Sequence, residues 1–505
     1  MVATTYTVAF EGVEAKRIEV QCALAAGLPS FSIVGLPDKA VSEARERVRA
    51  ALSALSIALP MKRITINLSP ADLPKEGPHF DLPIALALLS AIGILPPDEI
   101  DDVLSLGELS LDGRIKPVIG ALPAAMVAAE DARALICPKD CGAEAAWVGA
   151  TTVYAPATLN DAIRHLTSER PLTPAQPGAV TEAPPHGDLR DVKGQERAKR
   201  VLEIAAAGRH HMLMVGPPGT GKTMLARRLP ALLPELSAAE ALETSMVRSV
   251  AGLLAEGGIS RSRPYRALHH SATRAALIGG GRRAQPGEVS LAHNGVLFMD
   301  EFPEFSRDVL DSLRQALESD EITVSRANAH VRYPCRFLLV AAANPCRCGY
   351  MTDPSRACAR VPVCGADYMA KISGPLMDRF DLRIEVAGVD WREHRSLPEG
   401  ESTATVAARV ACARALQERR FQAHPNVRVN AEAEGRLLDE IATPDGEGQA
   451  LLLRAAERFS FSTRGYHRIL RTARTIADLD GSEAVRSPHL AEAISYRIVF
   501  DRPRG

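Results

Sequence analysis

The residues best suited to chemistry are in the segment GPPGTGKT at 216–223. It has the spacing Gly-x4-Gly-Lys-Thr, follows the apolar run HMLMV and precedes MLARRLPALL, so we expect it to join a strand to a helix. In that setting backbone N–H groups hold phosphates, Lys222 neutralises the outer phosphates and Thr223 binds magnesium. A glycine-rich turn without a ligand is disfavoured by this context. The expected nucleotide contacts are Gly216, Pro217, Pro218, Gly219, Thr220, Gly221, Lys222 and Thr223.

Two acids follow the apolar run VLFM, further along the chain. A buried strand that ends in Asp300 and Glu301 suits magnesium-assisted hydrolysis, with Asp300 binding the metal through water and Glu301 polarising the attacking water. Two solvated acids at a strand end are the alternative, and the phosphate loop upstream disfavours it. The next apolar run, FLLVAAAN, ends in Asn344, whose amide is suited to orient the same water. These residues together predict a site for ATP hydrolysis with Mg²⁺.

The composition indicates an ordinary globular protein. A chain of 505 residues with 46% hydrophobic content is long enough for about three domains. The net charge is −1, so no overall basic field attracts nucleic acid and any polyanion site must be local. The longest apolar stretch, 82–96, is too short to span a bilayer and has proline near both ends, so we expect a core helix. With no secretory h-region in the first residues, we expect a cytoplasmic protein that does not contact a membrane.

The chain is organised in four parts. Residues 168–188 hold five prolines without apolar periodicity, which predicts a semi-rigid linker between an N-terminal domain, 1–167, and a nucleotide-binding domain, 189–395. Residues 396–505 show apolar spacing of three and four throughout, which predicts a helical domain. Short strands such as RITINL alternate in the N-terminal domain with amphipathic helices such as DKAVSEARERVRAALSAL, so we expect an α+β domain there.

The N-terminal segments PADLPKEGPHFDLPIALALLSAIG and GELSLDGRIKPVIGALPAA resemble the proteolytic domain of Lon proteases, which implies an S5-like α+β fold. In that family a serine follows the Gly-Pro and a lysine follows the later Gly-x-Leu. Here those positions are His79 and Pro123. Neither can serve as a serine nucleophile or a lysine base, so we expect no peptidase activity and a scaffold role instead.

Three further segments resemble AAA+ proteins and narrow the class of ATPase. DVKGQERAKRVLEIAAAG precedes the phosphate loop where AAA+ proteins contact adenine, which implies Val192 and Gln195 as contacts. Arg379, in SGPLMDRFDLRIEV, resembles an arginine finger that reaches the neighbouring subunit's γ-phosphate and so implies a ring. A local salt bridge to Asp378 or Asp381 is the alternative for Arg379. Arg464 matches the second sensor of magnesium-chelatase-type proteins, with Arg468 as the competing residue.

Nearly the whole chain resembles the ComM (YifB) family of magnesium-chelatase-like AAA+ proteins. Its signature segments here are FSIVGLPDKAVSEARERVRAAL, RITINLSPADLPKEG, GEVSLAHNGVLFMDEFPEF and SGPLMDRFDL. The resemblance implies an α/β P-loop AAA+ core with a C-terminal helical lid, assembled as a homo-hexameric ring. It further implies a motor on single-stranded or branched DNA that promotes branch migration in natural transformation, alongside recombination proteins.

Two segments are candidates for a DNA surface. The glycine-punctuated stretch 257–287 has no acidic residue and predicts a flexible basic insertion, while 322–336 alternates like a hairpin around 327–329. Aromatic residues make up only 4% of the chain, so we expect sequence-tolerant, salt-dependent binding. Ordinary solvated loops are the alternative. The candidate DNA contacts are Arg261, Arg263, Arg266, Arg282, Arg283, Arg326 and Arg332.

Four of the nine cysteines lie within nineteen residues, in CRCGYMTDPSRACARVPVC. Cys346, Cys348, Cys358 and Cys364 have a C-x-C-x9-C-x5-C spacing, and four thiolates in a tetrahedral arrangement would hold a structural zinc ion. Free thiols and a redox switch remain alternatives, because zinc knuckles usually begin with C-x-x-C.

Two functions of different class are consistent with these motifs. One is a ring ATPase that moves along DNA, and the other is a protein-remodelling ATPase resembling the motor subunit of magnesium chelatase. An ATP-dependent protease is disfavoured by His79 and Pro123.

Overall fold

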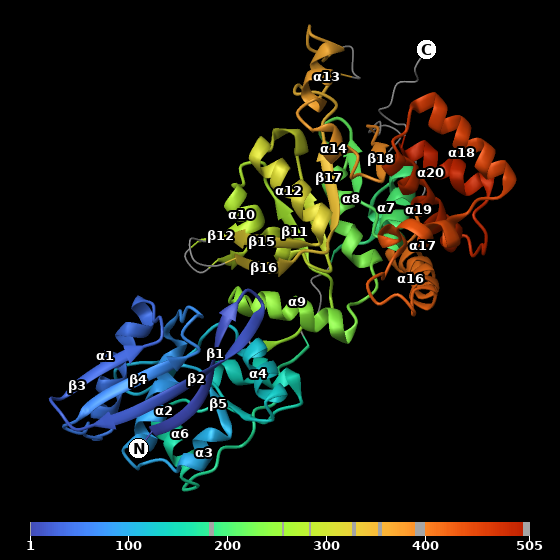
Figure 1. Ribbon diagram of the computed structural model, residues 1–505. Helices are drawn as coiled ribbons and strands as arrows, with labels where there is room; N and C mark the ends of the chain where they lie inside the picture. The colour runs from blue at the N-terminus through green and yellow to red at the C-terminus, as the bar shows by residue number, and fades with distance from the viewer. Residues whose placement is uncertain are drawn as a thin grey trace.

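The structure is a computed structural model, and it describes residues 2–180, 186–254, 257–281, 284–325, 330–351, 356–388 and 399–497. The chain forms an N-terminal lobe, blue to teal in Figure 1, and a larger lobe that holds the phosphate loop and the C-terminal helices. Within the described ranges, every helix is too short or too polar to cross a bilayer.

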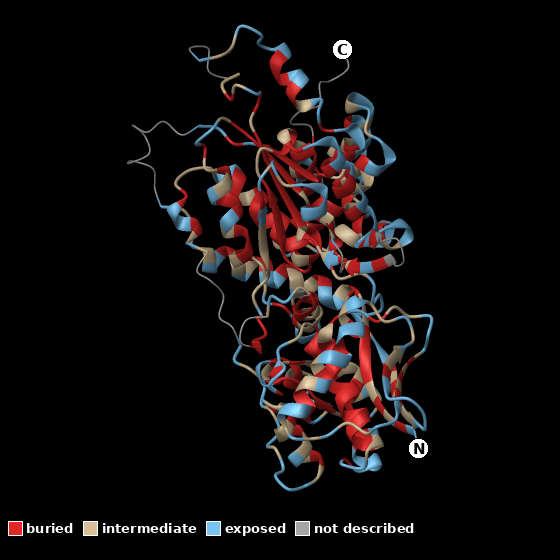
Figure 2. Cartoon of the chain, turned by 90° about the vertical axis from the view of Figure 1, so that its left-hand side faces the viewer, coloured by how far each residue is buried: buried red, intermediate tan, exposed pale blue. Residues whose placement is uncertain are grey.

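The larger lobe is built around a five-stranded sheet whose neighbouring strands all run parallel. Every residue of the three middle strands is buried, as expected of a parallel sheet covered on both faces. Figure 2 shows these strands as a red layer inside the lobe. In sheet order, the strands are β11 (Tyr265–Leu268), β14 (Val296–Met299), β17 (Leu338–Ala343), β10 (Met212–Val215) and β18 (Leu382–Glu385).

Alternate residues of each strand enter two different cores, because successive side chains of a strand point to opposite faces. Met212 and Met214 pack with α7 (Glu196–Gly208) and the C-terminal helices, whereas Leu213 and Val215 pack with α12 (Arg307–Ser319). The sheet edge that carries the carboxyl ends of β10, β14 and β17 is therefore held rigidly from both sides.

The C-terminal region is helical, as the apolar spacing predicts. Its helices share one hydrophobic core with α7, to which α16 and α19 contribute Val410 and Ala473. The helical region is therefore packed directly against the face of the sheet beside the phosphate loop. Its helices are α16 (Thr403–Arg420), α17 (Gly435–Ala442), α18 (Gly446–Phe459), α19 (Thr463–Leu479) and α20 (Ser487–Arg497).

The N-terminal lobe is an α+β layer with a seven-stranded mixed sheet, in the order β3-β4-β2-β1-β5-β8-β9. Its central helix, α2 (Asp81–Ala91), is buried from Asp81 to Ser90, so the core helix expected from the apolar stretch is present. The amphipathic pattern of DKAVSEARERVRAALSAL likewise forms α1 (Lys39–Ala54). The strands are β1 (Val2–Glu11), β2 (Glu14–Ala25), β3 (Ser30–Val34), β4 (Arg63–Ser69), β5 (Val103–Ser105), β8 (Ala134–Ile136) and β9 (Val153–Tyr154).

The lobes meet where α4 (Ala121–Glu130) packs on α9 (Ala238–Val250). Trp147 Nε1 donates a hydrogen bond to the Gly257 carbonyl at 2.9 Å, and Ser249 Oγ bonds the buried Glu144 carboxylate. The described linker residues form no helix or strand and follow the N-terminal lobe, where Ala175 N–H donates to the Val153 carbonyl.

The basic stretch 257–287 differs from the flexible insertion that its glycines predict. Its described part contributes β11 to the central sheet, followed by α10 (Arg274–Ile278) and a short hairpin of β12 (Gly279–Gly280) and β13 (Gln285–Pro286). The sequence pattern does not predict β11, because this strand is only four residues long and half-buried. The predicted hairpin at 322–336 is present as β15 (Glu321–Ser325) and β16 (His330–Pro334).

Candidate functional site

The phosphate loop lies between β10 and α8 (Lys222–Arg228), as its flanking runs predict. Gly219 and Gly221 have φ values of 78° and 87°, a region that side chains other than glycine rarely adopt. A Cβ at Gly216 would lie 2.2 Å from the Val386 carbonyl, so only glycine fits beside the end of β18. The loop is therefore shaped by glycine where the backbone turns back over the helix N-terminus.

The Lys222 ammonium is folded into the loop. Its Nζ donates to the carbonyls of Gly216 at 2.6 Å and Pro217 at 2.9 Å, and lies 3.4 Å from Asn344 Oδ1. Burial lowers the pKa of Lys222, and the nearby carboxylates of Asp300 and Glu301 act in the opposite direction. The loop thus holds one buried cation at the position where the motif requires a phosphate ligand.

Thr223 and Asp300 come together across the gap between α8 and β14. Thr223 Oγ1 donates to Asp300 Oδ2 at 2.9 Å, and Asp300 Oδ1 accepts the Glu301 N–H at 2.9 Å. A hydroxyl and a carboxylate beside a phosphate loop are oxygen donors of the kind that Mg²⁺ prefers. This donor set fits magnesium, which when bound neutralises phosphate charge during transfer.

The carboxylate of Glu301 is turned toward a histidine. Glu301 has a left-handed backbone, with φ of 51°, and its Oε2 lies 2.7 Å from His270 Nδ1. His270 follows β11, the strand next to β14, and its ring packs on His269 at 4.0 Å between centroids. Sequence reasoning placed His270 in the basic stretch and missed this contact. The contact between His270 and Glu301 arises because β11 pairs with β14. It could have been predicted only by recognising residues 265–268 as a strand.

Asn344 directly follows β17, between β14 and β10 in the sheet. Its Oδ1 is the acceptor nearest to Lys222 Nζ outside the loop itself. Strand order thus brings Asn344, Lys222 and Asp300 to one edge of the sheet, although they are far apart in sequence.

Val192 and Gln195 lie before α7, in a segment that also approaches the phosphate loop. Val192 is buried in the core that α7 shares with β10, and Gln195 Nε2 donates to the Ala387 carbonyl at 2.6 Å. Ala387 follows Val386, whose carbonyl closes over Gly216. The segment therefore lies beside the phosphate loop, on the side of β18.

Arg379 follows α14 (Gly374–Met377) and forms an ion pair with Glu318 at the end of α12. This partner is neither Asp378 nor Asp381, the two acids considered from sequence. The pair lines a cavity of about 280 Å³ whose walls also carry Arg209, Arg468 and several acids. Arg379 is thus paired with an acid of its own subunit in this structure.

The two sensor candidates on α19 differ in their surroundings. Arg468 Nη1 donates to Asp381 Oδ1 at 2.6 Å and to the Arg379 carbonyl at 2.8 Å, so its guanidinium binds the segment just before β18. Arg464, near the start of α19, is exposed and has no ion pair with any described residue. Of the two, Arg464 has the free guanidinium.

The candidate DNA contacts that the structure describes fall into three groups. Arg263 is largely buried, bonding the Pro234 and Asn294 carbonyls and pairing with Glu240, so it serves the fold and is removed from the candidates. Arg266, on β11, forms a two-point pair with Glu288 at 2.6 Å. Arg332 on β16 is exposed, as is Arg261, which lies 4.0 Å from Glu235. The remaining candidates, Arg282, Arg283 and Arg326, lie outside the described residues.

The cysteine cluster lies between Asn344 and Arg379. The Sγ atoms of Cys346 and Cys348 are 2.9 Å apart, Cys348 contacts Cys358, and Cys364 contacts Cys358 and Cys346. Among the described residues, His269, His270 and Glu301 have donor atoms that all lie within 4.8 Å of one another, as a shared metal ion would require. No three of the cysteines in the described ranges are gathered this closely. The four Sγ atoms would have to rearrange to enclose zinc, because the 2.9 Å between Cys346 and Cys348 is shorter than the roughly 3.8 Å between two thiolates of a tetrahedral zinc site.

The two positions compared with Lon proteases are both buried. His79 Nε2 lies 2.9 Å from the Val8 carbonyl, and its ring packs between Phe10 and Phe80. Pro123 is buried in α4. Neither residue is the serine or the lysine that stands at the corresponding position in Lon proteases.

The sheet is parallel, and its strand order places a phosphate loop after β10, acids after β14 and an asparagine after β17. Together with the packed C-terminal helices, these features define a P-loop protein of the AAA+ type. Family models agree with this class. "Magnesium chelatase, subunit ChlI" matches residues 188–394, "Subunit ChlI of Mg-chelatase" matches 18–141, and "Magnesium chelatase, subunit ChlI C-terminal" matches 400–497.

The relatives narrow the family further. Competence protein ComM of Haemophilus influenzae is 43% identical over 98% of this chain and 97% of its own length. YifB of Escherichia coli is 42% identical over 98% of this chain and 96% of its own. The magnesium-chelatase 38 kDa subunit of Rhodobacter capsulatus is 26% identical over 65% of this chain and 92% of its own length. The chain belongs to the ComM/YifB family of magnesium-chelatase-like AAA+ proteins.

Proposed function

We propose that this protein is an ATP-driven motor that forms a hexameric ring, moves along single-stranded or branched DNA and promotes branch migration when imported strands recombine in natural transformation. It would act in the cytoplasm together with recombination proteins. The name of the Haemophilus relative, a competence protein, supports the process, and family membership supports the use of ATP and Mg²⁺.

The observation that carries the ATPase part is the contact between Thr223 and Asp300. This 2.9 Å hydrogen bond joins the phosphate loop to the acid after β14, with Lys222 Nζ on the same sheet edge. ATP bound here would have its outer phosphates at Lys222, while Thr223 and Asp300 would hold Mg²⁺. Glu301, one residue on, would accept a proton from the attacking water once its carboxylate leaves His270.

The ring is supported by Arg379. Its guanidinium faces its own Glu318 rather than the acids of its own nucleotide site, so it is available to a neighbour's site once that ion pair opens. In such an assembly Arg379 would stabilise the charge on the transferred phosphate of the next subunit. Arg464, free of ion pairs with described residues, would serve the nucleotide of its own subunit as a second sensor.

The DNA surface would lie on β16 and on the loop before β11. Arg332 and Arg261 are exposed there and can meet phosphates, whereas Arg266 would first have to leave Glu288. The N-terminal lobe would be a Lon-protease-like (S5-like) scaffold without peptidase activity, since its His79 and Pro123 are packed in the core.

A structural zinc ion at the four cysteines is part of the proposal. The contacts that link Cys346, Cys348, Cys358 and Cys364 in pairs support it, because four thiolates complete a tetrahedral site. Zinc would fasten the segment between Asn344 and Arg379. Zinc content of the purified protein near one ion per chain, lost in a Cys346→Ser variant, is the expected result, and a metal-free protein with normal ATP turnover would exclude zinc.

The test of the motor is ATP turnover with and without DNA. Forked duplexes and four-way junctions are expected to raise turnover of the full-length protein, and Glu301→Gln is expected to bind ATP but to hydrolyse it about a hundredfold or more slowly. Glu304→Gln, which changes a nearby acid paired with Lys371, is the matched control. If DNA leaves ATP turnover unchanged while a protein partner raises it, the result would favour the alternative, a protein-remodelling ATPase like the magnesium-chelatase subunit.

A further inference from the structure

The N-terminal lobe has an open sheet edge far from the nucleotide site. β3 is the last strand of the seven-stranded sheet, and within the described part of the chain it pairs only with β4, in parallel, over Ser30–Val34. Figure 1 shows β3 at the outer left of the lobe, with β4, β2 and β1 between it and the phosphate-loop lobe. A strand edge of this kind presents unpaired N–H and C=O groups to whatever lies beside it.

A hollow of about 350 Å³ opens beside this edge. Eight of its twelve lining residues are apolar, among them Phe31, Leu59, Met61 and Ile64. Its volume is at the lower end of the range of ligand-binding pockets. The hollow is formed where β3, the end of α1 and the segment before β4 meet, so it is continuous with the strand edge.

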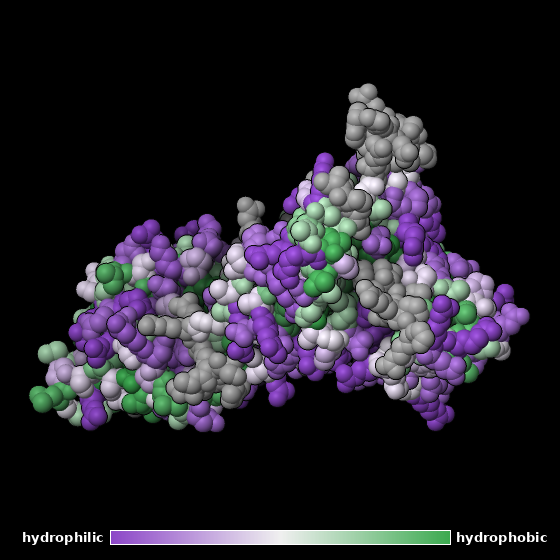
Figure 3. Space-filling view, turned by 90° about the horizontal axis from the view of Figure 1, so that it is seen from above, coloured by the Kyte–Doolittle hydropathy of each residue, from purple (hydrophilic) through white to green (hydrophobic). Residues whose placement is uncertain are grey.

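The rim of the hollow carries unusually exposed apolar side chains. Met61 is 83% exposed, and Leu28, two residues before β3, is 89% exposed. Figure 3 shows hydrophobic atoms at this left-hand end of the molecule. Large apolar side chains gathered at an open edge are characteristic of surfaces that are covered by a partner.

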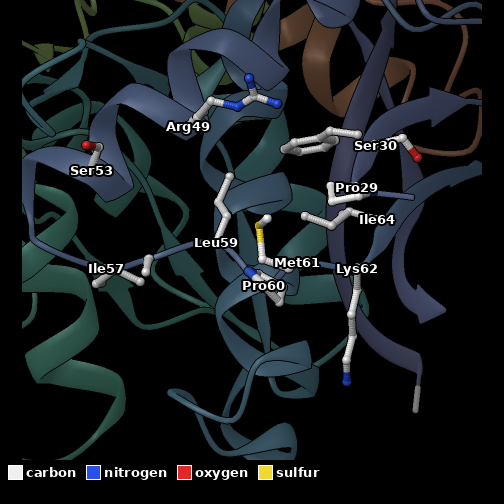
Figure 4. Close-up of a pocket in the computed structure, with 12 residues that line it drawn as sticks. Pro29, Ser30, Arg49, Ser53, Ile57, Leu59, Pro60, Met61, Lys62 and Ile64 are labelled. Carbon is white, nitrogen blue, oxygen red and sulfur yellow. The ribbon is translucent and has the colours of Figure 1, made fainter. Parts of the chain in front are cut away.

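The two charged side chains among the described residues that line the hollow are both positive. Arg49 and Lys62 line it, Arg63 follows, and none of the three has an ion pair with any residue in the described ranges. In Figure 4 the Arg49 guanidinium and the Lys62 ammonium lie on opposite sides of the apolar side chains. None of the lining residues that the structure describes carries a carboxylate. A partner that fits this arrangement has apolar side chains for the hollow and carboxylates for both cations.

We propose that the edge of β3 and this hollow bind an extended acidic peptide segment of another protein, which adds a strand beside β3, inserts apolar side chains against Met61 and Ile64, and pairs its carboxylates with Arg49 and Lys62. Backbone hydrogen bonds along an open edge give such complexes affinity, and pockets for alternate side chains give specificity. The hollow favours a peptide over nucleic acid, because its only aromatic ring, Phe31, is 7% exposed and offers no stacking face. This surface is independent of the ATPase and of DNA.

The experiment uses the full chain and a fluorescein-labelled peptide, Asp-Leu-Asp-Val-Asp-Leu-Asp-Val, in fluorescence anisotropy. We expect micromolar binding, and at least about tenfold weaker binding for Met61→Glu and for Lys62→Glu. Matched controls are Leu453→Glu, which changes an exposed leucine of α18, and Lys139→Glu, which changes an exposed lysine away from the hollow. Both controls should bind as the unchanged protein does.

Several outcomes would overturn the proposal. These are an absence of peptide binding, equal binding by Met61→Glu and Leu453→Glu, and equal binding of a peptide in which lysine replaces aspartate. Displacement of the peptide by single-stranded oligothymidine would make the surface a nucleic-acid site. A smaller assembly of Met61→Glu in sedimentation would show that a second copy of the chain occupies the edge. Unchanged far-UV circular dichroism establishes that each variant is folded.

Discussion

His270 Nδ1 lies 2.7 Å from Glu301 Oε2, so the acid suited to activate water is in contact with a histidine that follows the neighbouring strand. Both side chains are partly exposed, which limits such an ion pair to about 1 kcal/mol. Releasing Glu301 from this contact would therefore change turnover by at most about fivefold.

Replacing His270 by alanine is expected to raise ATP turnover in the absence of DNA, by up to about fivefold, with KM for ATP unchanged. The reason is that the Glu301 carboxylate would no longer be shared with an imidazole. Steady-state ATPase assays measure this, with His269→Ala as the control because it leaves the contact intact. A fall in turnover to the level of Glu301→Gln would instead mean that His270 assists the reaction.

Lys222→Ala is expected to weaken nucleotide binding by at least about tenfold, since a hydrogen bond to a charged group is worth about 1.5–3 kcal/mol. The Nζ atom already lies among the Gly216 and Pro217 carbonyls, so no other cation of the loop can replace it. Titration with a fluorescent ATP analogue measures the affinity. Lys371→Ala, which removes an exposed lysine paired with Glu304, should bind normally.

Arg379→Ala is expected to lose most ATP turnover as a uniform assembly, because a finger arginine contributes about a thousandfold or more. Mixing it with Lys222→Ala subunits should restore part of the turnover, since each intact Arg379 can then act on a neighbour's intact loop. Glu318→Gln, which frees Arg379 without removing it, should keep its activity. No recovery in any mixture would count against a site shared between subunits.

Arg263 and Arg332 are expected to behave in opposite ways. Arg263→Ala would leave Glu240 with less compensation in a largely buried position and cost about 3 kcal/mol of stability, seen as a lower melting temperature. Arg332→Ala should leave stability unchanged and weaken DNA-stimulated turnover, with a salt dependence shallower by about one ion. Equal effects of the two substitutions on stability would contradict this division.

Much of the fold could be predicted because its signals are local. The apolar run before GPPGTGKT, the VLFM run and the FLLVAAA run each form a buried strand, and the helices after residue 402 follow their apolar spacing. The short strand β11 was missed because four residues with one buried position carry no clear period.

The residues of the candidate site could be predicted only where a sequence motif identifies them and their role. The residues of the phosphate loop and the acids after VLFM are named by their spacing, whereas His270 reaches Glu301 only through the pairing of β11 with β14. Arg263 illustrates the opposite error. An arginine in an acid-free stretch suggests a phosphate contact, yet its partner Glu240 lies on α9, outside the stretch from which the charge was judged.

We expect the fold to lose stability in acid because of His211. Its Nδ1 accepts the Leu339 N–H at 3.1 Å, and its carbonyl accepts the N–H groups of Asp381 and Leu382, so it ties β10 to β17 and β18. Burial lowers the pKa of His211 to about 3, although Asp381 acts in the opposite direction. In the unfolded chain this pKa returns to about 6.5, so between these values the unfolded state binds the extra proton.

Stability contributed by neutral His211 is therefore complete above about pH 6.5 and falls by up to about 1.4 kcal/mol per unit as the pH drops toward 3. His211→Gln keeps an acceptor but does not titrate. Between pH 6.5 and 5.5, its melting temperature should therefore fall less than that of the unchanged protein, by about 1 °C. Thermal unfolding followed by circular dichroism measures this. The exposed His269→Gln serves as the control, and parallel curves for the unchanged protein and His211→Gln would show that His211 does not set the acid limit.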